Sequence, residues 1–471
     1  MTSKHFHFSG ICGTAMASLA VLLKERGHKI TGSDENIYPP MSTLLEEKEI
    51  EVFQGYHASH LEPKPDYVVL GNALSRGNAE VEHSLKEHLH YLSMAELLKN
   101  EFIRGNKSLV ISGTHGKSTT TSLAAHMFTQ AEKPTGFLVG GIPLNFGTSC
   151  LDVEKGGYFV VEGDEYDTSF FDKRSKFFHY LPDRLVITNI EFDHADIYNN
   201  IEEIKRSFTL MLRQMPANGL IIANGDDEDT LEVARKGFCP LQTYGFGKGN
   251  EAIISNITPL KGQIGVTFDL GFGGKSVSFE INMFGEHNVM NATAVILLAR
   301  HEGISDEVIQ VGLKSFKGVR RRLELLTENP DTPVFDDFAH HPTAILETIK
   351  GLRMAWPEAT IHAIYEARSN TSISKVHQIK MAKAFAEADR ITFYKLHRKE
   401  RLHKEELLDL NQVVAELLAQ GKQASHIKDL DLIKSHVIQK VEKGDIILVM
   451  SQGSFGGLAS QLAKEIDKRH A

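Results

Sequence analysis

The chain has 471 residues, of which 41% are hydrophobic and 24% charged, and at ~150 residues per domain this length predicts about three domains. The composition excludes an intrinsically disordered chain, a collagen and a disulfide-rich secreted module. A formal net charge of −9 provides no basic excess for binding nucleic acid. Three cysteines cannot form a disulfide framework, and no apolar run approaches the ~18 residues of a membrane helix.

The mildly apolar stretch after Lys4 is similar in composition to a signal peptide. Gly10 and Gly13 interrupt it, and the charged residues 24–26 follow with no clean cleavage site. A strand, a glycine turn and a helix explain the stretch better. We therefore expect a cytoplasmic protein with no membrane partner.

Residues 1–105 predict a first α/β domain. The pattern indicates a strand over 5–9, a helix over 14–26 and further strands over 28–31 and 66–70. Strands that alternate with helices form a parallel sheet. The sequence therefore predicts a Rossmann-like N-terminal domain.

Residues 106–318 predict a central domain built on a parallel sheet, as in P-loop ATPases. From 252 to 283 alternating strands with glycine turns predict a small antiparallel sheet, and a helix over 288–301 closes the domain. Parallel strands are expected at 108–112, 158–161, 185–188 and 220–223.

Residues 319–471 predict a second Rossmann-like domain, reached through a connection at 317–323. Helical stretches separate its strands, so a parallel sheet is again expected. The overall fold class is therefore α/β with three domains. The expected strands of this last domain are 334–335, 361–365, 391–394 and 446–450.

The strongest chemical signal is the segment 112–119, Ser-Gly-Thr-His-Gly-Lys-Ser-Thr, between an expected strand and an expected helix. In a phosphate loop, backbone N–H groups bind phosphate oxygens, a lysine neutralises the outer phosphates and a hydroxyl binds Mg²⁺. The full pattern has a glycine where this chain has Ile111, so we interpret the segment as a shortened variant. An ordinary strand–helix turn is the alternative. The nucleotide-binding candidates are Gly113, Thr114, His115, Gly116, Lys117, Ser118 and Thr119.

Two acidic clusters follow expected strands of the same sheet. Residues 162–167 begin with Glu162, a candidate ligand for the Mg²⁺ that accompanies ATP, although a solvated acidic loop is the alternative. Residues 188–196 place His194 between two aspartates. No second His or Cys lies at zinc-ligand spacing, so a second Mg²⁺ or a structural histidine are the interpretations that remain.

Three further motifs are candidates for nucleotide or substrate binding. Residues 285–292 open a helix with amides that suit an adenine edge, or that simply cap the helix. Residues 10–14, followed by Asp34, form a loose dinucleotide fingerprint that lacks its third glycine, so a diphosphate on the helix N-terminus is the better expectation. In the third domain, residues 336–342 would line a nucleotide or substrate, and Arg368 is a candidate clamp for a substrate carboxylate.

In this order, these motifs resemble the Mur ligase superfamily across essentially the whole chain. That family joins a carboxylate to an amine with ATP and Mg²⁺. The glycine loop at 10–13, the acidic motif at Glu162, and Asp337 with residues 340–342 resemble the branch that accepts UDP-N-acetylmuramate. The resemblance implies an acyl-phosphate intermediate on the lactyl carboxylate, which the amine then attacks.

Two ligases share that branch. One attaches the recycled tripeptide L-alanyl-γ-D-glutamyl-meso-diaminopimelate, and the other adds L-alanine in biosynthesis. The stretches that resemble the tripeptide ligase more closely are 71–73, 75–78, 164–167, 170–176, 192–196 and 368–371. Tripeptide attachment is therefore the prediction and L-alanine addition the alternative. A nucleotide sensor that keeps the fold without catalysis is the alternative from another class.

The resemblance also implies residue and domain roles. Residues 1–105 would bind the UDP-sugar, 106–318 ATP and 319–471 the peptide, in a monomer or weak homodimer. The implied catalytic residues are Lys117, Glu162, His194 and Arg322, with Ser118, Glu162 and His194 as Mg²⁺ ligands. The implied ATP site adds His287, Asn288, Asn291, Arg322, Asp337 and His340. The implied substrate residues are Gly10, Gly13, Thr14, Asp34, Asn72, Arg368, Ser369 and Asn370.

Overall fold

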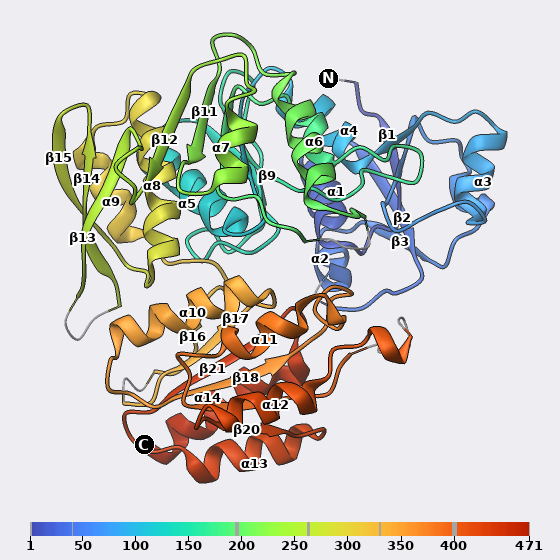
Figure 1. Ribbon diagram of the computed structural model, residues 1–471. Helices are drawn as coiled ribbons and strands as arrows, with labels where there is room; N and C mark the ends of the chain where they lie inside the picture. The colour runs from blue at the N-terminus through green and yellow to red at the C-terminus, as the bar shows by residue number, and fades with distance from the viewer. Residues whose placement is uncertain are drawn as a thin grey trace. The chain divides into compact units, whose positions relative to one another are not determined.

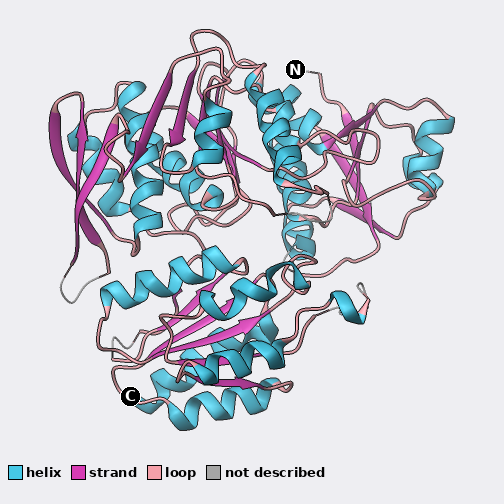
Figure 2. Ribbon diagram, in the orientation of Figure 1, coloured by secondary structure: helices cyan, strands magenta, loops and turns pink. Residues whose placement is uncertain are grey.

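The fold is α/β, with three sheets and helices packed on them (Figures 1 and 2). The structure, a computed structural model, describes residues 2–39, 41–193, 197–260, 264–328, 331–397 and 403–470. Contacts divide the chain into two compact units. The first comprises residues 1–192, 200–253 and 294–312, and the second comprises residues 193–199, 254–293 and 313–471.

The N-terminal sheet has five parallel strands in the order β3-β2-β1-β4-β5. Strand β2 extends three residues beyond the predicted 28–31, because Ser33 pairs with Ser9 and Asp34 pairs with Gln54. The strands are β1 (His5–Ser9), β2 (Lys29–Asp34), β3 (Glu51–Gln54), β4 (Tyr67–Leu70) and β5 (Tyr91–Ser93). The helices are α1 (Thr14–Glu25), α2 (Met41–Glu47), α3 (Ala79–Lys86) and α4 (Met94–Leu98).

Helix α1 is buried on every side through its middle turns, residues 16–23. A helix with apolar residues all round is enclosed by other elements rather than lying on the surface, and α1 contacts β8 of the central sheet as well as its own strand β2. Polar contacts fix this junction. Arg26 forms a bidentate pair with Asp152 at 2.6 Å, and Ser18 Oγ lies 2.9 Å from Ser149 Oγ.

The central sheet has ten strands in the order β15-β14-β13-β12-β11-β10-β6-β9-β7-β8. The strands from β7 to β12 in that order are parallel, and β14 and β15 form the predicted antiparallel pair. The strands are β6 (Lys107–Ser112), β7 (Thr135–Leu138), β8 (Cys150–Leu151), β9 (Tyr158–Gly163), β10 (Arg184–Ile187), β11 (Leu220–Asn224), β12 (Leu241–Gly245), β13 (Ala252–Pro259), β14 (Val266–Phe272) and β15 (Lys275–Ile281). The helices are α5 (Lys117–Gln130), α6 (Ile201–Leu212), α7 (Glu228–Ala234), α8 (Glu286–His301) and α9 (Asp306–Ser315).

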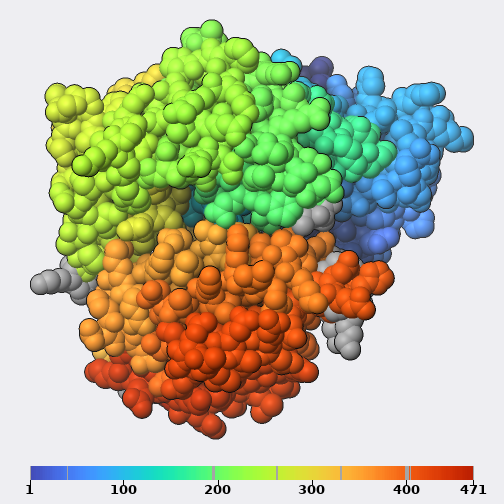
Figure 3. Space-filling view, viewed as in Figure 1, coloured from blue at the N-terminus to red at the C-terminus, as the bar shows by residue number. Residues whose placement is uncertain are grey.

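The C-terminal sheet has six strands in the order β16-β17-β21-β18-β19-β20, parallel except for β16. Neighbouring residues of β17 face opposite layers. Phe335 joins the apolar core under α10, α11 and α12, and Val334 joins the core under α13 and α14. These orange-to-red segments form one continuous body (Figure 3). Their bounds are β16 (Glu324–Leu325), β17 (Val334–Asp337), α10 (Pro342–Ala355), β18 (Ile361–Glu366), α11 (Gln378–Ala384), β19 (Arg390–Phe393), α12 (Leu410–Ala419), β20 (Gln423–His426), α13 (Leu430–Lys440), β21 (Ile446–Ser451) and α14 (Leu458–His470).

Among the described residues, no helix combines the length and the apolar character needed to cross a membrane.

Candidate active site

The predicted phosphate loop lies between β6, which ends at Ser112, and α5, which begins at Lys117. Two of its positions require glycine. A β-carbon at Gly113 would collide with the Thr188 hydroxyl, and both Gly113 and Gly116 have positive φ, +133° and +84°. Residues other than glycine rarely adopt such φ values. The sequence thus builds a tight turn that leads directly into a helix N-terminus, where backbone N–H groups can bind an anion.

The loop is held by residues that follow the neighbouring strand β10. The backbone N–H of Thr114 donates to the Asn189 carbonyl at 2.9 Å, and that of His115 donates to Asn189 Oδ1 at 2.8 Å. The Thr188 hydroxyl donates to the His115 carbonyl at 2.6 Å. We had assigned no role to Asn189 from the sequence. Its position in the cluster after a parallel strand was the available signal.

Lys117 is enclosed by the loop that carries it. Its Nζ donates to the Gly113 carbonyl at 2.6 Å and lies 2.9 Å from an oxygen of Glu165, which is only 2% exposed. Burial alone would lower the pKa of Lys117, but the carboxylates of Glu165, Asp164 and Glu162 outweigh burial and raise it. The lysine therefore stays cationic, and Glu165 is its buried counter-ion.

Ser118 and Glu162 lie together, as a shared metal ligand set requires. Ser118 Oγ donates to Glu162 Oε1 at 2.8 Å, and the other carboxylate oxygen accepts from the Gly140 N–H at 2.8 Å. Burial, with Asp164 nearby, raises the pKa of Glu162 against the opposing charge of Lys117. A carboxylate beside a hydroxyl is a hard oxygen pair of the kind that Mg²⁺ prefers.

The strand that carries Glu162 is longer than predicted. We expected β9 to stop at Val161, but pairing of Ile111 with Glu162 and of Ser112 with Gly163 carries the strand on to Gly163. Glu162, the candidate metal ligand, thus lies on the strand rather than in the loop that follows it. His194, the candidate ligand for a second ion, lies outside the described residues.

The N-terminal glycine loop has a similar backbone and a different chemistry. Gly10 has a φ of +85°, and the N–H groups of Gly10 and Ile11 both donate to the Ser33 carbonyl, at 2.8 and 3.1 Å. Both oxygens of Asp34 are used by the backbone: Oδ2 accepts from Cys12 N–H at 3.0 Å and Oδ1 from Asn36 N–H at 2.9 Å. Asp34 therefore stabilises the loop itself.

The remaining predicted residues of that site lie around the same edge of the sheet. Gly13 precedes α1 and Thr14 is its first residue, so a helix N-terminus opens there. Asn72 is exposed and follows Gly71, whose N–H donates to the Ser9 carbonyl at 3.0 Å at the end of β1. The structure brings these residues together with Gly10.

A buried carboxylate that we did not predict stabilises the N-terminal glycine loop. Glu80 on α3 has no exposed surface, and its Oε2 accepts hydrogen bonds from the hydroxyls of Ser9 and Ser33 at 2.5 and 2.6 Å. Burial alone would raise the pKa of Glu80, but the His7 imidazole, whose Nε2 lies 3.4 Å away, and the hydrogen bonds from Ser33 and Ser9 outweigh burial and lower it to about 2. Nothing in the sequence distinguishes this glutamate from a surface residue of a short helix.

The amide residues proposed for adenine lie on the first turns of α8, which begins two residues earlier than predicted. Asn288 Nδ2 donates to the Phe284 carbonyl at 2.8 Å, and Asn291 Nδ2 donates to Asn288 Oδ1 at 3.3 Å. Burial lowers the pKa of His287. Its buried Nδ1 has no hydrogen-bond partner within the described part of the chain.

The segment that leads into the C-terminal domain is tied to the end of β17. Asp337 is buried, and its two oxygens accept from the N–H groups of Leu323 and Ala339 at 2.6 and 2.7 Å. The Arg322 guanidinium lies 4.7 Å from the centre of the Phe338 ring, and His340 Nδ1 is 3.0 Å from the Phe338 carbonyl. Asp337 thus anchors the backbone beside Arg322.

Arg368 lies just beyond the end of β18. Its Nη1 is 3.7 Å from Glu366 Oε2, and its backbone N–H donates to Ser372 Oγ at 3.0 Å. Ser369 Oγ accepts from the Ser372 N–H at 3.0 Å, and Asn370 is partly exposed in the same turn. The three predicted substrate residues therefore share one ordered turn at the carboxyl end of a parallel sheet, where ligands of such sheets bind.

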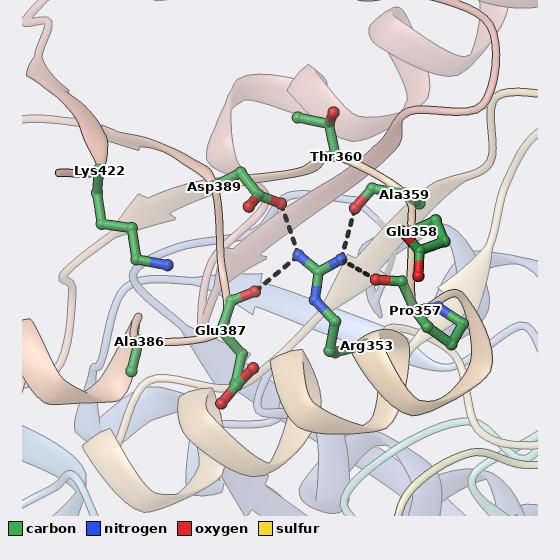
Figure 4. A pocket seen from close by; sticks show the side chains of 9 residues that line it. All are labelled: Arg353, Pro357, Glu358, Ala359, Thr360, Ala386, Glu387, Asp389 and Lys422. Carbon is green, nitrogen blue, oxygen red and sulfur yellow. Dashed lines mark hydrogen bonds and ion pairs between the residues drawn. The ribbon is translucent and has the colours of Figure 1, made fainter.

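A hollow lies at the opposite, amino edge of the same sheet (Figure 4). Its charged centre is already satisfied, because the Arg353 guanidinium donates to Asp389 and to three backbone carbonyls. We interpret it as a structural corner. Its lining residues are Arg353, Pro357, Glu358, Ala359, Thr360, Ala386, Glu387, Asp389 and Lys422.

Three domain families of the Mur ligases match the chain in succession. The catalytic domain of the Mur ligase family matches residues 5–104, the Mur ligase middle domain 111–299 and the glutamate ligase domain 321–453. The chain belongs to the Mur ligase family. It is thus an ATP-dependent ligase that forms amide bonds, which confirms the predicted enzyme class and fold class.

Individual relatives of this Mur ligase are similar over nearly its whole length. A UDP-N-acetylmuramate–L-alanyl-γ-D-glutamyl-meso-2,6-diaminoheptandioate ligase of Haemophilus influenzae is 40% identical over 465 residues, which cover 98% of this chain and 99% of that protein. The crystal structure of a murein peptide ligase from Psychrobacter arcticus is 34% identical and covers 99% of both chains with a TM-score of 0.70. A UDP-N-acetylmuramate–L-alanine ligase of Clostridium acetobutylicum is 31% identical over 466 residues, covering 96% of this chain and 95% of that protein.

Proposed function

We propose that this Mur ligase joins UDP-N-acetylmuramate to L-alanyl-γ-D-glutamyl-meso-diaminopimelate in peptidoglycan recycling, in the bacterial cytoplasm. The observation that carries the proposal is the difference between two relatives of similar coverage. The relative named for the tripeptide reaction is 40% identical to this chain, whereas the relative named for L-alanine addition is 31% identical. The murein peptide ligase structure, which aligns over 99% of both chains, supports the same choice.

The chemistry needs an activated carboxylate, because the oxygen of a free carboxylate is a poor leaving group. Transfer of the ATP γ-phosphate to the lactyl carboxylate of UDP-N-acetylmuramate gives an acyl phosphate. The α-amine of the tripeptide attacks its carbonyl carbon, and the tetrahedral intermediate expels phosphate. The protein supplies positioning and charge neutralisation. Lys117, the first residue of α5 and only 11% exposed, is the cation that would neutralise the β- and γ-phosphates.

The site also fits Mg²⁺. A metal ion bound there would neutralise phosphate charge and orient the transferred group. Ser118 Oγ and Glu162 Oε1, which lie 2.8 Å apart, would hold it, and His194 would hold a second ion. Because burial raises the pKa of Glu162, protons compete with the metal for this carboxylate, and Mg²⁺ affinity falls as the pH falls.

We assign the other steps to the three domains by chemistry. Residues 1–105 would bind the UDP-sugar through Gly10, Gly13, Thr14, Asp34 and Asn72. Residues 106–318 would bind ATP, with His287, Asn288 and Asn291 at adenine. Residues 319–471 would bind the peptide through Arg368, Ser369 and Asn370. The connection would bring Arg322 to the γ-phosphate, with Asp337 and His340 near the nucleotide. We expect a monomer or weak homodimer.

Phosphate release tests the proposal directly. The purified enzyme is given ATP, Mg²⁺ and UDP-N-acetylmuramate with either the tripeptide or L-alanine, and product masses are recorded. We expect turnover with the tripeptide, no turnover with L-alanine, and loss of turnover when EDTA removes the metal. Turnover with L-alanine alone would instead assign the protein to biosynthesis.

A further inference from the structure

A glycine after the last strand of the C-terminal sheet lies against the guanidinium of Arg368. A β-carbon built at Gly453 would come within 2.5 Å of Arg368 Nε, and closer still to Cζ and Nη1. The φ of Gly453 lies outside the left-handed region, so its backbone conformation is open to any residue. The neighbouring arginine is therefore the reason that position 453 needs a glycine.

The backbone at Gly453 cannot move away to make room. Its N–H donates to Ser451 Oγ at 2.9 Å, and its carbonyl accepts from Arg321 Nη2 at 2.5 Å. Ser451 is 1% exposed and belongs to the central strand β21. The Arg368 side chain, by contrast, is 34% exposed. A methyl group at position 453 would thus displace the arginine rather than the strand.

A buried carboxylate holds the same guanidinium. Glu366 ends β18 and pairs in register with Ser451 of β21. Its Oε2 lies 3.7 Å from Arg368 Nη1 and accepts from Ser451 Oγ at 2.5 Å, and the residue is 3% exposed. Ser451 thereby connects both supports, since it binds Glu366 through its hydroxyl hydrogen and Gly453 through its hydroxyl oxygen.

We propose that Gly453 is a positioning residue for peptide recognition. Because Gly453 has no side chain, the Arg368 guanidinium can lie against it, and Glu366 holds the guanidinium from a second side. In this position the guanidinium binds a carboxylate of the incoming peptide. This inference rests on the proposed function. Carboxylate recognition by arginine is bidentate and depends on orientation, and a displacement on the scale of a methyl group is enough to disrupt it.

The test is Gly453→Ala. We expect the KM for the tripeptide to rise roughly 10- to 100-fold, the range that loss of hydrogen bonds to a charged group produces, with the KM values for ATP and UDP-N-acetylmuramate unchanged. Gly249→Ala is the matched control, because position 249 also lies outside the left-handed region and has no atom within 4 Å of its β-carbon. That control should keep wild-type kinetics.

A double-mutant cycle separates positioning from a general structural effect. If Gly453 acts through Arg368, Gly453→Ala adds nothing in an Arg368→Ala background. If its role is independent, the two losses multiply, and the proposal is wrong. If Gly453→Ala fails to fold, Arg368→Lys tests the same guanidinium position, because lysine keeps the positive charge but lacks the planar guanidinium group.

Peptide analogues identify the group that is bound. Amidation of the recognised carboxylate should raise the KM for wild-type enzyme and leave that of Arg368→Ala unchanged. Wild-type turnover is measured first. No turnover of the tripeptide by the wild type overturns the proposed function and this inference together. Wild-type turnover with an unaltered tripeptide KM in Gly453→Ala overturns this inference alone.

Discussion

Two glycine loops in the first compact unit have the same backbone plan and different chemistry. Each follows a strand of a parallel sheet and opens a helix, and each contains a glycine with positive φ, Gly10 at +85° and Gly116 at +84°. In the first loop the ordering carboxylate is Asp34, which accepts two backbone N–H groups. The second loop carries Lys117 with its counter-ion Glu165.

This difference distinguishes a loop suited to binding a substrate from a loop suited to phosphoryl transfer. A helix N-terminus with a glycine turn suffices to hold a diphosphate, and the first loop offers that. Phosphoryl transfer also needs cations where charge develops. The second loop would supply one as Lys117, and Ser118 and Glu162, which are in contact, would provide ligands for another. Changes in the second loop should therefore reduce the rate of the reaction, whereas changes in the first should weaken substrate binding.

Lys117→Ala should have the largest effect. We expect kcat to fall at least about 1,000-fold, because the cation that would face the transferred phosphate is lost. Phosphate release in the complete assay measures it. Lys236→Ala is the control, since that lysine pairs with Glu232 on the exposed face of a helix and should keep near-normal turnover.

The lysine variant leaves Glu165 buried without its lysine, which can destabilise the protein. Lys117→Ala combined with Glu165→Gln removes both charges and restores the balance. We expect the double variant to be more stable than Lys117→Ala and equally inactive. Near-normal phosphate release in either variant would mean that the loop does not act on the phosphate that is transferred.

Glu80→Gln probes the support of the first loop. The buried carboxylate has its pKa lowered from its usual 4.5 to about 2, which corresponds to roughly 3 kcal/mol of stabilisation at neutral pH. Hydrogen exchange of the β1 segment should report a local loss of about that size. Glu82→Gln on the same helix is the matched control. Its pKa is also lowered to about 2, but its side chain is 41% exposed, and solvent screens its ion pair with Arg76.

The pH dependence of this effect has a defined sign. Because the folded-state pKa of Glu80 is depressed, its stabilisation is complete above about pH 4.5 and is lost as the pH falls towards 2. The difference between wild type and Glu80→Gln should therefore be largest at neutral pH and shrink in acid. A difference that stays constant from pH 7 to pH 2 would contradict an ionised Glu80.

Local sequence patterns predicted many of the strands, helices and turns, but they did not reveal contacts between residues that are distant in sequence. Strand β1 and the loop from Gly113 to Lys117 could be predicted because apolar runs and glycine turns are properties of neighbouring residues. The short strand β8 has two residues, too few to produce a pattern. Asn189 and Glu80 act across 74 and 71 positions in sequence. The same residue types occur at many exposed positions, so only the fold reveals their roles.

Among these variants, Gly10→Ala should have the smallest effect, and it tests whether the first glycine loop binds substrate. Gly27 provides a matched control, because its φ of +87° is nearly that of Gly10, and no atom lies within 4 Å of its β-carbon. Alanine at either position adopts a disfavoured φ, so both variants should lose similar stability, about 1–2 kcal/mol. Only Gly10→Ala should raise the KM for UDP-N-acetylmuramate, by roughly tenfold, because only there would a methyl group meet the diphosphate that approaches the backbone. The KM for ATP should stay unchanged in both variants. Equal KM values for the UDP-sugar in both variants would mean that backbone strain, rather than substrate approach, explains why position 10 is a glycine.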